Sequence, residues 1–278
     1  MKTYAPRTPS RRHMTGILYR GVLTQKKAPE KSLTAGFQRH VGRNNVGRIT
    51  VRHKGGGHKR RYRLVSFTYD KKEIPARITS IEYDPNRTGF IALLLYKDGE
   101  RRYVLAGRDM KEGGEVLYSE NAQVRSGNAL PLSKLVPGTF VYNIEFKPEG
   151  GARLVRSAGS FAEIVAQEGK YTTLKLPSKE IRKVSSKSWA TIGSPSNEEH
   201  MFVTIGKAGR SRWMGIRPTV RGSAMNPVDH PYGGGEGRQM RGTRRPKNLW
   251  GRGTRGVKTR DKKKYSQRLI VTRRIKRK

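Results

Sequence analysis

Positive charge in this chain is concentrated at its two ends. Residues 1–63 contain 17 Lys or Arg and one acidic residue, Glu30, and residues 238–278 contain 18 Lys or Arg and one acidic residue, Asp261. Residues 64–200, in contrast, contain 20 basic and 17 acidic residues. Blocks of like charge repel and are typical of segments that a polyanion orders. Two cationic arms around a nearly neutral body therefore indicate a nucleic-acid-binding protein.

The remaining composition narrows the class of protein. The 278 residues include no cysteine, which excludes a disulfide-bonded scaffold or partner and thiol-ligated zinc, and which fits a reducing cytosol. No apolar signal core follows Met1, and the longest apolar run, 90–96, is too short to cross a bilayer. Glycine and proline interrupt both arms, which argues against a basic membrane-surface helix. We therefore expect a soluble cytoplasmic protein.

The body of the chain predicts a mainly β fold. The imperfect alternation of Val65, Phe67 and Tyr69 and the runs 75–83, 90–96 and 101–105 predict antiparallel strands. Asp84-Pro85-Asn86 predicts a turn, and Asp98-Gly99 predicts a two-residue hairpin.

A second group of short strands is predicted after residue 127. Phe140, Tyr142, Ile144 and Phe146 alternate with more polar positions, as in a half-buried strand, and further strands are expected at 161–166, 171–176 and 180–184. Short strands at this spacing favour two small barrels that divide near residues 120–130. One helix is predicted from the capping box of Ser196 and Glu199 to Gly206. We find no internal repeat.

The segment 42–61 interleaves glycine with cations and has no acidic residue. Glycine allows a backbone to approach phosphate, and long cationic side chains supply charge-assisted hydrogen bonds. The alternative interpretation, a solvated linker, does not require so many charges. The RNA-binding candidates in this segment are Arg43, Arg48, Arg52, Lys54, His58, Lys59, Arg60 and Arg61.

Further candidates lie in short loops. Arg87 follows the 84–86 turn, and Arg156 lies in a segment of small residues where RNA could approach; for both, a solvated surface position is an equal alternative. The segment 207–221 adds Lys207, Arg212, Arg217 and Arg221. Trp213 in the same segment could stack on a base, although packing into the second barrel is the favoured interpretation.

The segment 224–238 contains an adjacent Asp229 and His230 and ends at Arg238. Neighbouring residues of an extended chain point in opposite directions, so Asp229 is poorly placed to orient His230 for catalysis. We therefore expect His230 and Arg238 to contact RNA in an ordered turn. His53 and His58 lack further ligands for a metal site. We expect no enzyme activity, no metal and no cofactor.

Several strings resemble one family, the bacterial-type universal second protein of the large ribosomal subunit, and the resemblance runs nearly end to end. They are Gly42 to Asn45, Gly55 to Lys59, Tyr83 to Arg87, Tyr96 to Tyr103, Arg156 to Gly159, Gly206 to Gly209 and Met225 to Arg238.

This resemblance implies an oligonucleotide-binding-type barrel followed by an SH3-like barrel. It implies a basic N-terminal extension at 1–37, the first barrel with its basic lead-in at 38–124, the second barrel at 125–200 and a basic C-terminal extension at 201–278. It further implies a primary assembly protein that binds large-subunit ribosomal RNA, contacts other ribosomal proteins, and supports contact with the small subunit.

The resemblance also implies roles for individual residues. Arg87 and Arg156 match positions implicated in RNA binding, and His230 matches a histidine that supports the RNA peptidyl-transferase region, close to transfer RNA. Tyr232 stands where the family often has a second histidine, which puts a two-histidine proton relay in doubt. Two alternatives remain: a DNA-compacting protein, which would more typically show a recognition helix, and an RNA-modifying enzyme, which would need a nucleophile or a cofactor loop.

Overall fold

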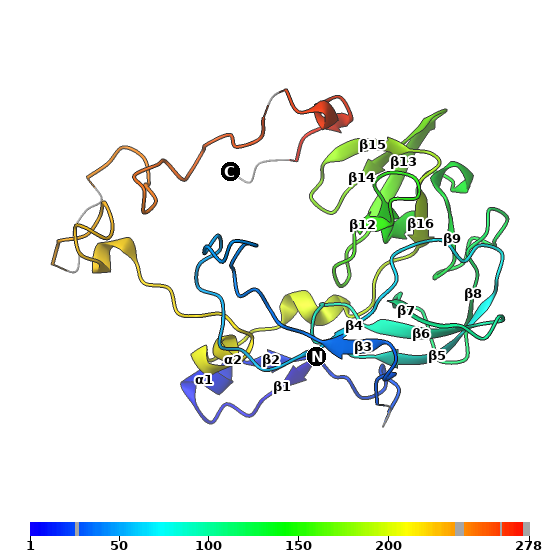
Figure 1. The fold of residues 1–278 in the computed structure, drawn as a ribbon, viewed down its shortest axis with the longest axis horizontal. Helices are drawn as coiled ribbons and strands as arrows, with labels where there is room; N and C mark the ends of the chain where they lie inside the picture. Colours follow the sequence, from blue (N-terminus) through cyan, green and yellow to red (C-terminus); the bar gives the residue numbers. More distant parts are fainter. Residues whose placement is uncertain (26–27, 237–241, 262, 275–278) are drawn as a thin grey trace. The chain divides into compact units, whose positions relative to one another are not determined.

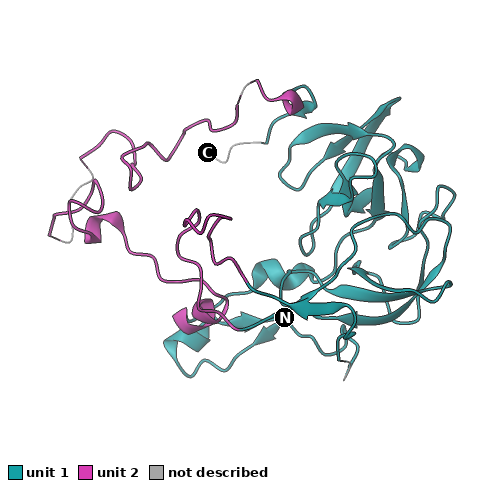
Figure 2. Cartoon of the chain, viewed as in Figure 1, with its two compact units in different colours: residues 1–38, 59–207, 268–278 teal, residues 39–58, 208–267 magenta. Residues whose placement is uncertain are grey.

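The computed structural model describes residues 1–25, 28–236, 242–261 and 263–274. The chain forms two compact units (Figure 2). Unit 1 comprises residues 1–38, 59–207 and 268–278, and unit 2 comprises residues 39–58 and 208–267. Each unit therefore combines segments that are distant in the sequence.

The first barrel of unit 1 is built on a four-stranded antiparallel sheet in the order β7-β6-β5-β8 (Figure 1). These strands are β5 (Ala76–Glu82), β6 (Ile91–Tyr96), β7 (Arg101–Leu105) and β8 (Glu115–Val116). The pair β3 (Thr34–Gly36) and β4 (Arg61–Arg63) leads to a parallel bridge between Val65 and Tyr103 of β7. Buried apolar side chains from all four strands of the sheet form one core cluster.

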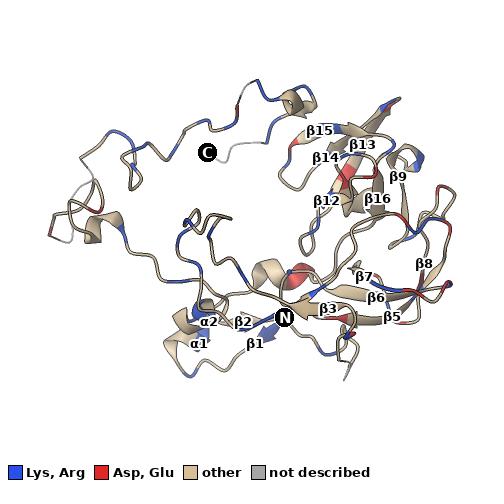
Figure 3. Ribbon diagram, viewed as in Figure 1, with Lys and Arg blue, Asp and Glu red and all other residues tan. Residues whose placement is uncertain are grey.

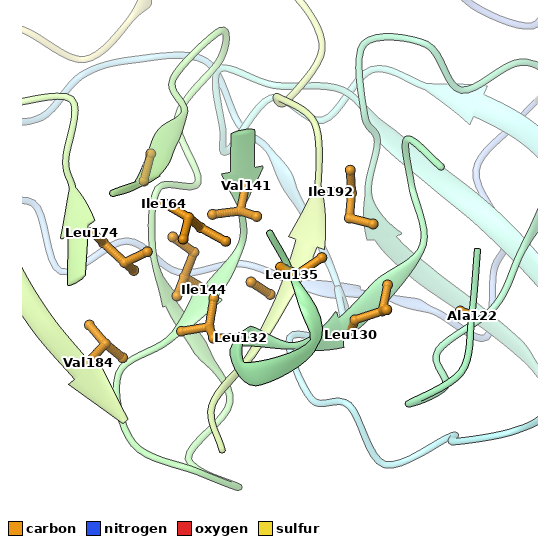
Figure 4. Close-up of a cluster of buried hydrophobic side chains, with 12 residues drawn as sticks. Ala122, Leu130, Leu132, Leu135, Val141, Ile144, Ile164, Leu174, Val184 and Ile192 are labelled. Atoms are coloured by element: carbon orange, nitrogen blue, oxygen red, sulfur yellow. The ribbon is translucent and has the colours of Figure 1, made fainter. Parts of the chain in front are cut away.

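The second barrel is built on a seven-stranded sheet in the order β17-β15-β14-β13-β10-β16-β9. The strands are β9 (Ala129–Pro131), β10 (Phe140–Tyr142), β13 (Ala162–Glu168), β14 (Tyr171–Lys175), β15 (Ile181–Ser185), β16 (Trp189–Ile192) and β17 (Ile270–Thr272). A two-stranded sheet, β11 (Ile144–Glu145) with β12 (Ala152–Leu154), accompanies it. The apolar side chains of β9 to β16 point toward one another in a single core (Figure 4). The predicted fold class, two consecutive small barrels with little helix, is confirmed.

Tyr69 joins the two barrels within unit 1. Its ring packs edge-on against Tyr118 at a centroid distance of 5.4 Å and stacks on Trp189 at 6.0 Å. Its hydroxyl bonds to the backbone oxygen of Asn143 and lies 2.9 Å from Thr191 Oγ1. Burial raises the pKa of Tyr69, so the phenol stays a neutral hydrogen-bonding group. Buried aromatic and polar contacts thus hold the barrels together.

The expected continuous strand at 140–146 is wrong. Asn143 has a φ of 51°, in the left-handed region, and separates β10 from β11. Because the chain turns there, Val141 and Ile144 both enter the same core, while Phe140 is 50% exposed. A strict alternation would have placed Val141 and Ile144 on opposite faces.

The predicted helix from Ser196 to Gly206 is also wrong. The chain forms only a 3₁₀-helix, η2 (Glu198–Phe202), because Asn197 has a φ of 66°. Ser196 Oγ does not cap this helix; it accepts a hydrogen bond of 3.1 Å from the Phe90 backbone N–H. A short α-helix that the sequence analysis missed, α2 (Ala208–Trp213), follows in unit 2.

Two further local expectations need correction. β4 ends at Arg63, so Phe67 and Tyr69 lie in irregular chain and not in a strand. The β6–β7 connection has three residues between Tyr96 and Glu100, because Tyr96 N–H bonds to Glu100 O and Gly99 N–H returns to Tyr96 O. Gly99 has a φ of 84°, as the last residue of a three-residue hairpin loop requires.

The first residues of the chain pack on the first barrel. β1 (Lys2–Thr3) pairs with β2 (Thr15–Gly16), with the short helix α1 (Pro9–Arg12) between them. Ile17 and Leu23 pack against the first core, and Thr24 exchanges hydrogen bonds with Ile81. The remaining 3₁₀-helices are η1 (Leu132–Lys134), η3 (Gly222–Ala224) and η4 (Tyr265–Gln267).

Candidate nucleic-acid interface

Arg87 is held in place by the turn that precedes it. The Asp84 side chain is fully buried, and its Oδ1 accepts the Asn86 N–H at 2.9 Å. Its Oδ2 lies 2.6 Å from Arg87 Nε. This ion pair holds Nε of the Arg87 guanidinium in place. The guanidinium carbon lies 5.3 Å from the centroid of the Phe67 ring.

Arg156 reaches the same ring from the second barrel. Its guanidinium carbon lies 4.4 Å from the Phe67 centroid, and Nη1 donates to Ala152 O at 3.4 Å. Burial lowers the pKa of Arg156, and the nearby Arg87 and Arg153 guanidinium groups lower it further. Arg156 thus lies among like charges, since Arg87 and Arg153 line the same cleft. The structure therefore brings together the two arginines that the sequence analysis selected.

These arginines line a cleft of about 890 Å³ within unit 1. The lining residues of this cleft are Tyr62, Phe67, Asn86, Arg87, Thr88, Arg153, Leu154, Val155, Arg156, Ser157, Ser160, Leu176, Pro177 and Ser178. They include three arginines, several hydroxyl groups and no carboxylate. Guanidinium and hydroxyl donors on an aromatic floor suit a phosphate group with an attached base.

Two more of the selected arginines contact the turn that precedes Arg87. Arg60 Nη1 donates to Pro85 O at 2.7 Å, and Asn86 Nδ2 donates to Arg61 O at 2.9 Å. Both contacts tie the basic segment to the turn that carries Arg87. Arg60 thus has a structural partner in addition to its charge.

In unit 2, the glycine-rich segment pairs with residues 213–217. Lys54 forms an antiparallel bridge with Ile216, while Gly55 N–H donates to Gly215 O and His58 N–H to Trp213 O. A Cβ on Gly57 would lie 2.6 Å from Gly215 N. Glycine at this position therefore allows two protein segments to approach each other. From the sequence, glycine in this segment was expected to allow the backbone to approach phosphate.

The favoured packing of Trp213 into a barrel is wrong. Its side chain is 53% exposed, and its ring lies 6.3 Å from the His58 ring within unit 2. Nearby, the Arg212 side chain is exposed and its Nη2 would lie 4.0 Å from a Cβ on Gly56. Trp213 and His58 thus form an aromatic surface beside a cation.

His230 lies in a compact turn of unit 2. Its backbone N–H donates to Asn226 O, and Gly233 N–H donates to His230 O. Its Nδ1 accepts the Tyr232 N–H at 3.1 Å, and the His230 and Tyr232 rings are 5.0 Å apart. The Tyr232 hydroxyl bonds to Thr243 Oγ1 and accepts the Lys247 N–H. With Nδ1 used as an acceptor, the neutral ring carries its proton on Nε2.

None of the other selected residues is among the residues that line the cleft. Arg43, Arg48, Arg52, Lys54, Lys59, Lys207, Arg217 and Arg221 are all exposed. Arg238 lies outside the described residues. Figure 3 shows Lys and Arg along both segments of unit 2, whose sequence contains 21 basic and three acidic residues.

Sequence reasoning missed Phe67 and Asp84. Phe67 was predicted only as a strand position, and its role carries no local signal because it depends on side chains from both barrels. Asp84 was assigned only to a turn, although its burial makes it the anchor of Arg87. Among the described residues, no group of three or more His, Asp or Glu side chains could hold a metal ion. No helix in the described ranges is long and apolar enough to cross a membrane.

Two family models match the chain. The one described as Ribosomal Proteins L2, RNA binding N-terminal domain, matches residues 30–119. The one described as Ribosomal Proteins L2, C-terminal domain, matches residues 125–251. The two matches cover most of the chain, including the three arginines of the cleft and the turn of His230.

Proposed function

Because the chain belongs to the ribosomal protein L2 family, and is thus an RNA-binding protein of the large ribosomal subunit, we propose that it binds large-subunit ribosomal RNA through the cleft of Arg87 and Arg156. Other ribosomal proteins are further partners. In this proposal it acts as a primary assembly protein, supports association with the small subunit and lies near transfer RNA. Its role is structural, it has no catalytic activity, and its ribosomes are cytoplasmic.

The observation that carries the proposal is the sharing of one aromatic ring by two guanidinium groups. Phe67 lies within 5.3 Å of the Arg87 and 4.4 Å of the Arg156 guanidinium carbons. Cation–π contact orients such groups without neutralising them. Arg87 Nε already pairs with Asp84, but the two guanidinium groups still repel each other, and a phosphate between them would relieve that repulsion. The cleft is therefore complementary to an RNA backbone.

The selected exposed cations of the arms are proposed as further RNA contacts. Each phosphate contact releases counterions, so the arms would make binding strongly dependent on salt. We keep the boundaries 1–37, 38–124, 125–200 and 201–278 as the proposed functional division, in which the first and last segments are RNA-contacting extensions.

His230 is proposed to buttress the RNA of the peptidyl-transferase region. Its Nδ1 is occupied by the Tyr232 N–H, so Nε2–H can donate to an RNA oxygen or ring nitrogen. A residue with this role positions RNA and does not transfer protons. Replacement of His230 by Ala should therefore reduce the activity of fully assembled subunits only modestly, and complete loss of peptide-bond formation would contradict this role.

The test of the proposed function is binding of the full chain to transcribed large-subunit ribosomal RNA. Arg156→Gln should weaken binding roughly tenfold at physiological salt, since a charge-assisted hydrogen bond contributes about 1.5 to 3 kcal/mol. Arg125→Gln, which removes an exposed arginine outside the cleft, is the matched control and should have little effect. Equal dissociation constants for wild type and Arg156→Gln would overturn the assignment of the cleft. Duplex DNA that competes as well as the RNA at matched salt would favour a chromosomal role.

A further inference from the structure

Two segments of unit 2, far apart in the sequence, have the same sequence pattern. Residues 43–50 read Arg-Asn-Asn-Val-Gly-Arg-Ile-Thr, and residues 247–254 read Lys-Asn-Leu-Trp-Gly-Arg-Gly-Thr. Both follow the pattern cation-Asn-x-x-Gly-Arg-x-Thr. The chain therefore does contain a short internal repeat, contrary to the expectation from sequence.

In the first segment, Asn44 organises a hairpin. Its Oδ1 accepts the backbone N–H of Val46 at 3.1 Å and that of Arg48 at 2.9 Å. Asn44 N–H donates to Arg48 O at 2.9 Å, and Gly47 N–H donates to Asn44 O at 3.1 Å. Arg43 and Ile49 form an antiparallel bridge.

In the second segment, Asn248 makes the same bonds. Its Oδ1 accepts the N–H of Trp250 at 3.1 Å and that of Arg252 at 2.9 Å. Asn248 N–H donates to Arg252 O at 2.9 Å, and Gly251 N–H donates to Asn248 O at 3.0 Å. Lys247 and Gly253 form the corresponding antiparallel bridge.

Glycine and threonine complete both hairpins in the same way. Gly47 has a φ of 78° and Gly251 a φ of 72°, a conformation that favours glycine. Thr50 donates through N–H and Oγ1 to Gly42 O, and Thr254 donates through the same two groups to Pro246 O. The shared Asn, Gly and Thr thus each have the same structural role in both hairpins, which explains why the two sequences agree at these positions.

The two hairpins also present the same kinds of side chain to solvent. The cations Arg43 and Arg48 in one, and Lys247 and Arg252 in the other, are exposed. Neither segment contains an acidic residue. At the tip, Val46 and Trp250 occupy equivalent positions, and each is 72% exposed. An exposed tryptophan between two cations is costly to leave in water and is suited to stack on a nucleobase.

We propose that residues 43–50 and 247–254 are two equivalent RNA-binding hairpins. Each binds backbone phosphates through its two cations, and the second also stacks Trp250 on an unpaired base. The inference rests on the proposed function, because it takes ribosomal RNA as the ligand. Since internal hydrogen bonds hold each hairpin, less conformational entropy is lost on binding than for an unstructured arm.

The equivalence is tested by the salt dependence of binding, using the full chain and transcribed large-subunit ribosomal RNA. Arg43→Ala with Arg48→Ala, and Lys247→Ala with Arg252→Ala, should each reduce the slope of log K against log salt by roughly 1.5 to 2. Lys97→Ala with Lys111→Ala removes the same charge from exposed positions of the first barrel and should leave the slope nearly unchanged.

The tip residue is tested separately. Trp250→Val, which converts the second tip to the residue of the first, should weaken binding roughly tenfold without changing the salt slope, because stacking releases no counterions. Val46→Ala, the matched control at the equivalent position, should change affinity less than twofold. The stacking assignment would be overturned if Trp250→Val bound with unchanged affinity while the Lys247 and Arg252 double variant showed its full effect on the salt slope.

Failure of this inference can be separated from failure of the proposed function. If Arg156→Gln weakens binding but both hairpin double variants behave like the Lys97 and Lys111 control, only the hairpin inference is overturned. If the wild-type chain does not bind the RNA in preference to duplex DNA, both are overturned.

Discussion

At the scale of single residues, Arg87 serves two purposes that the sequence did not separate. It faces the cleft over Phe67, and it also neutralises the fully buried carboxylate of Asp84. Removal of one partner of a buried ion pair leaves an uncompensated charge, which costs more than the pair contributes. The residue therefore links the proposed RNA contact to the stability of the first barrel.

We predict that Arg87→Ala lowers the free energy of unfolding by roughly 3 kcal/mol, because it leaves the Asp84 carboxylate buried and unpaired. The measurement is urea unfolding of the full chain. Asp84→Asn combined with Arg87→Ala removes the buried charge and should recover most of this loss while RNA binding stays weak. Equal stability of wild type and Arg87→Ala would contradict the structural role of the pair. Arg156 has no such buried partner among the described contacts, so its replacement is the cleaner probe of binding.

At the scale of elements, the neighbouring glycines of the glycine-rich segment have different structural roles. Gly55 and Gly56 have positive φ values, and a Cβ there would meet only side-chain atoms at 3.8 Å or more. Gly57, in contrast, lies directly against the 213–217 segment. Cationic arms were expected to be ordered by RNA alone, yet in unit 2 they also pair through backbone hydrogen bonds.

We predict that Gly57→Ala disrupts this pairing, because its Cβ would collide with Gly215 N and Trp213 O. The backbone amides of Gly55 and His58, which donate to residues 215 and 213, should exchange with deuterium roughly tenfold faster or more. Gly209→Ala is the matched control, since a Cβ there meets nothing within 4 Å, and exchange should not increase. Unchanged exchange in Gly57→Ala would refute the close approach.

At the scale of the whole molecule, the segment before residue 25 belongs physically to the first barrel of unit 1. Tyr19 packs against Phe90 at a centroid distance of 6.0 Å, and Leu23 contacts the first core. Thr24 bonds to the edge of the sheet at Ile81. A basic composition therefore does not by itself distinguish an extension that follows RNA from a segment that covers a core.

We predict that Leu23→Ala lowers the free energy of unfolding by about 1 to 2 kcal/mol. The loss is smaller than for a core leucine because Leu23 is only partly buried. Val22→Ala, a change at the neighbouring residue that is 51% exposed, should cost much less. Thermal or urea unfolding of the two variants makes the comparison. Equal effects would mean that the segment does not contribute to the core.

Much of the fold could be predicted from the sequence. The runs that became β5, β6, β7 and β13 to β15 have local signals: apolar periodicity, β-branched residues and bounding turns. Charge segregation and the strings of the 42–61 and 225–238 segments likewise indicated RNA binding and the family. These properties are encoded by neighbouring residues, so they can be read without the structure.

Other properties arose only when distant segments met. The turn at Asn143 places Val141 and Ile144 in one core because the second barrel requires it, and Asn197 interrupts a helix that the local capping signal favoured. The shared ring of Phe67 needs side chains from two barrels, and the task of Gly57 depends on a segment more than 150 residues away. Most strands, the charge segregation and the family depend on local pattern, so they follow from the residues alone. Which arginines share a cleft depends on how the whole chain packs, because it requires contacts between residues that are distant in the sequence.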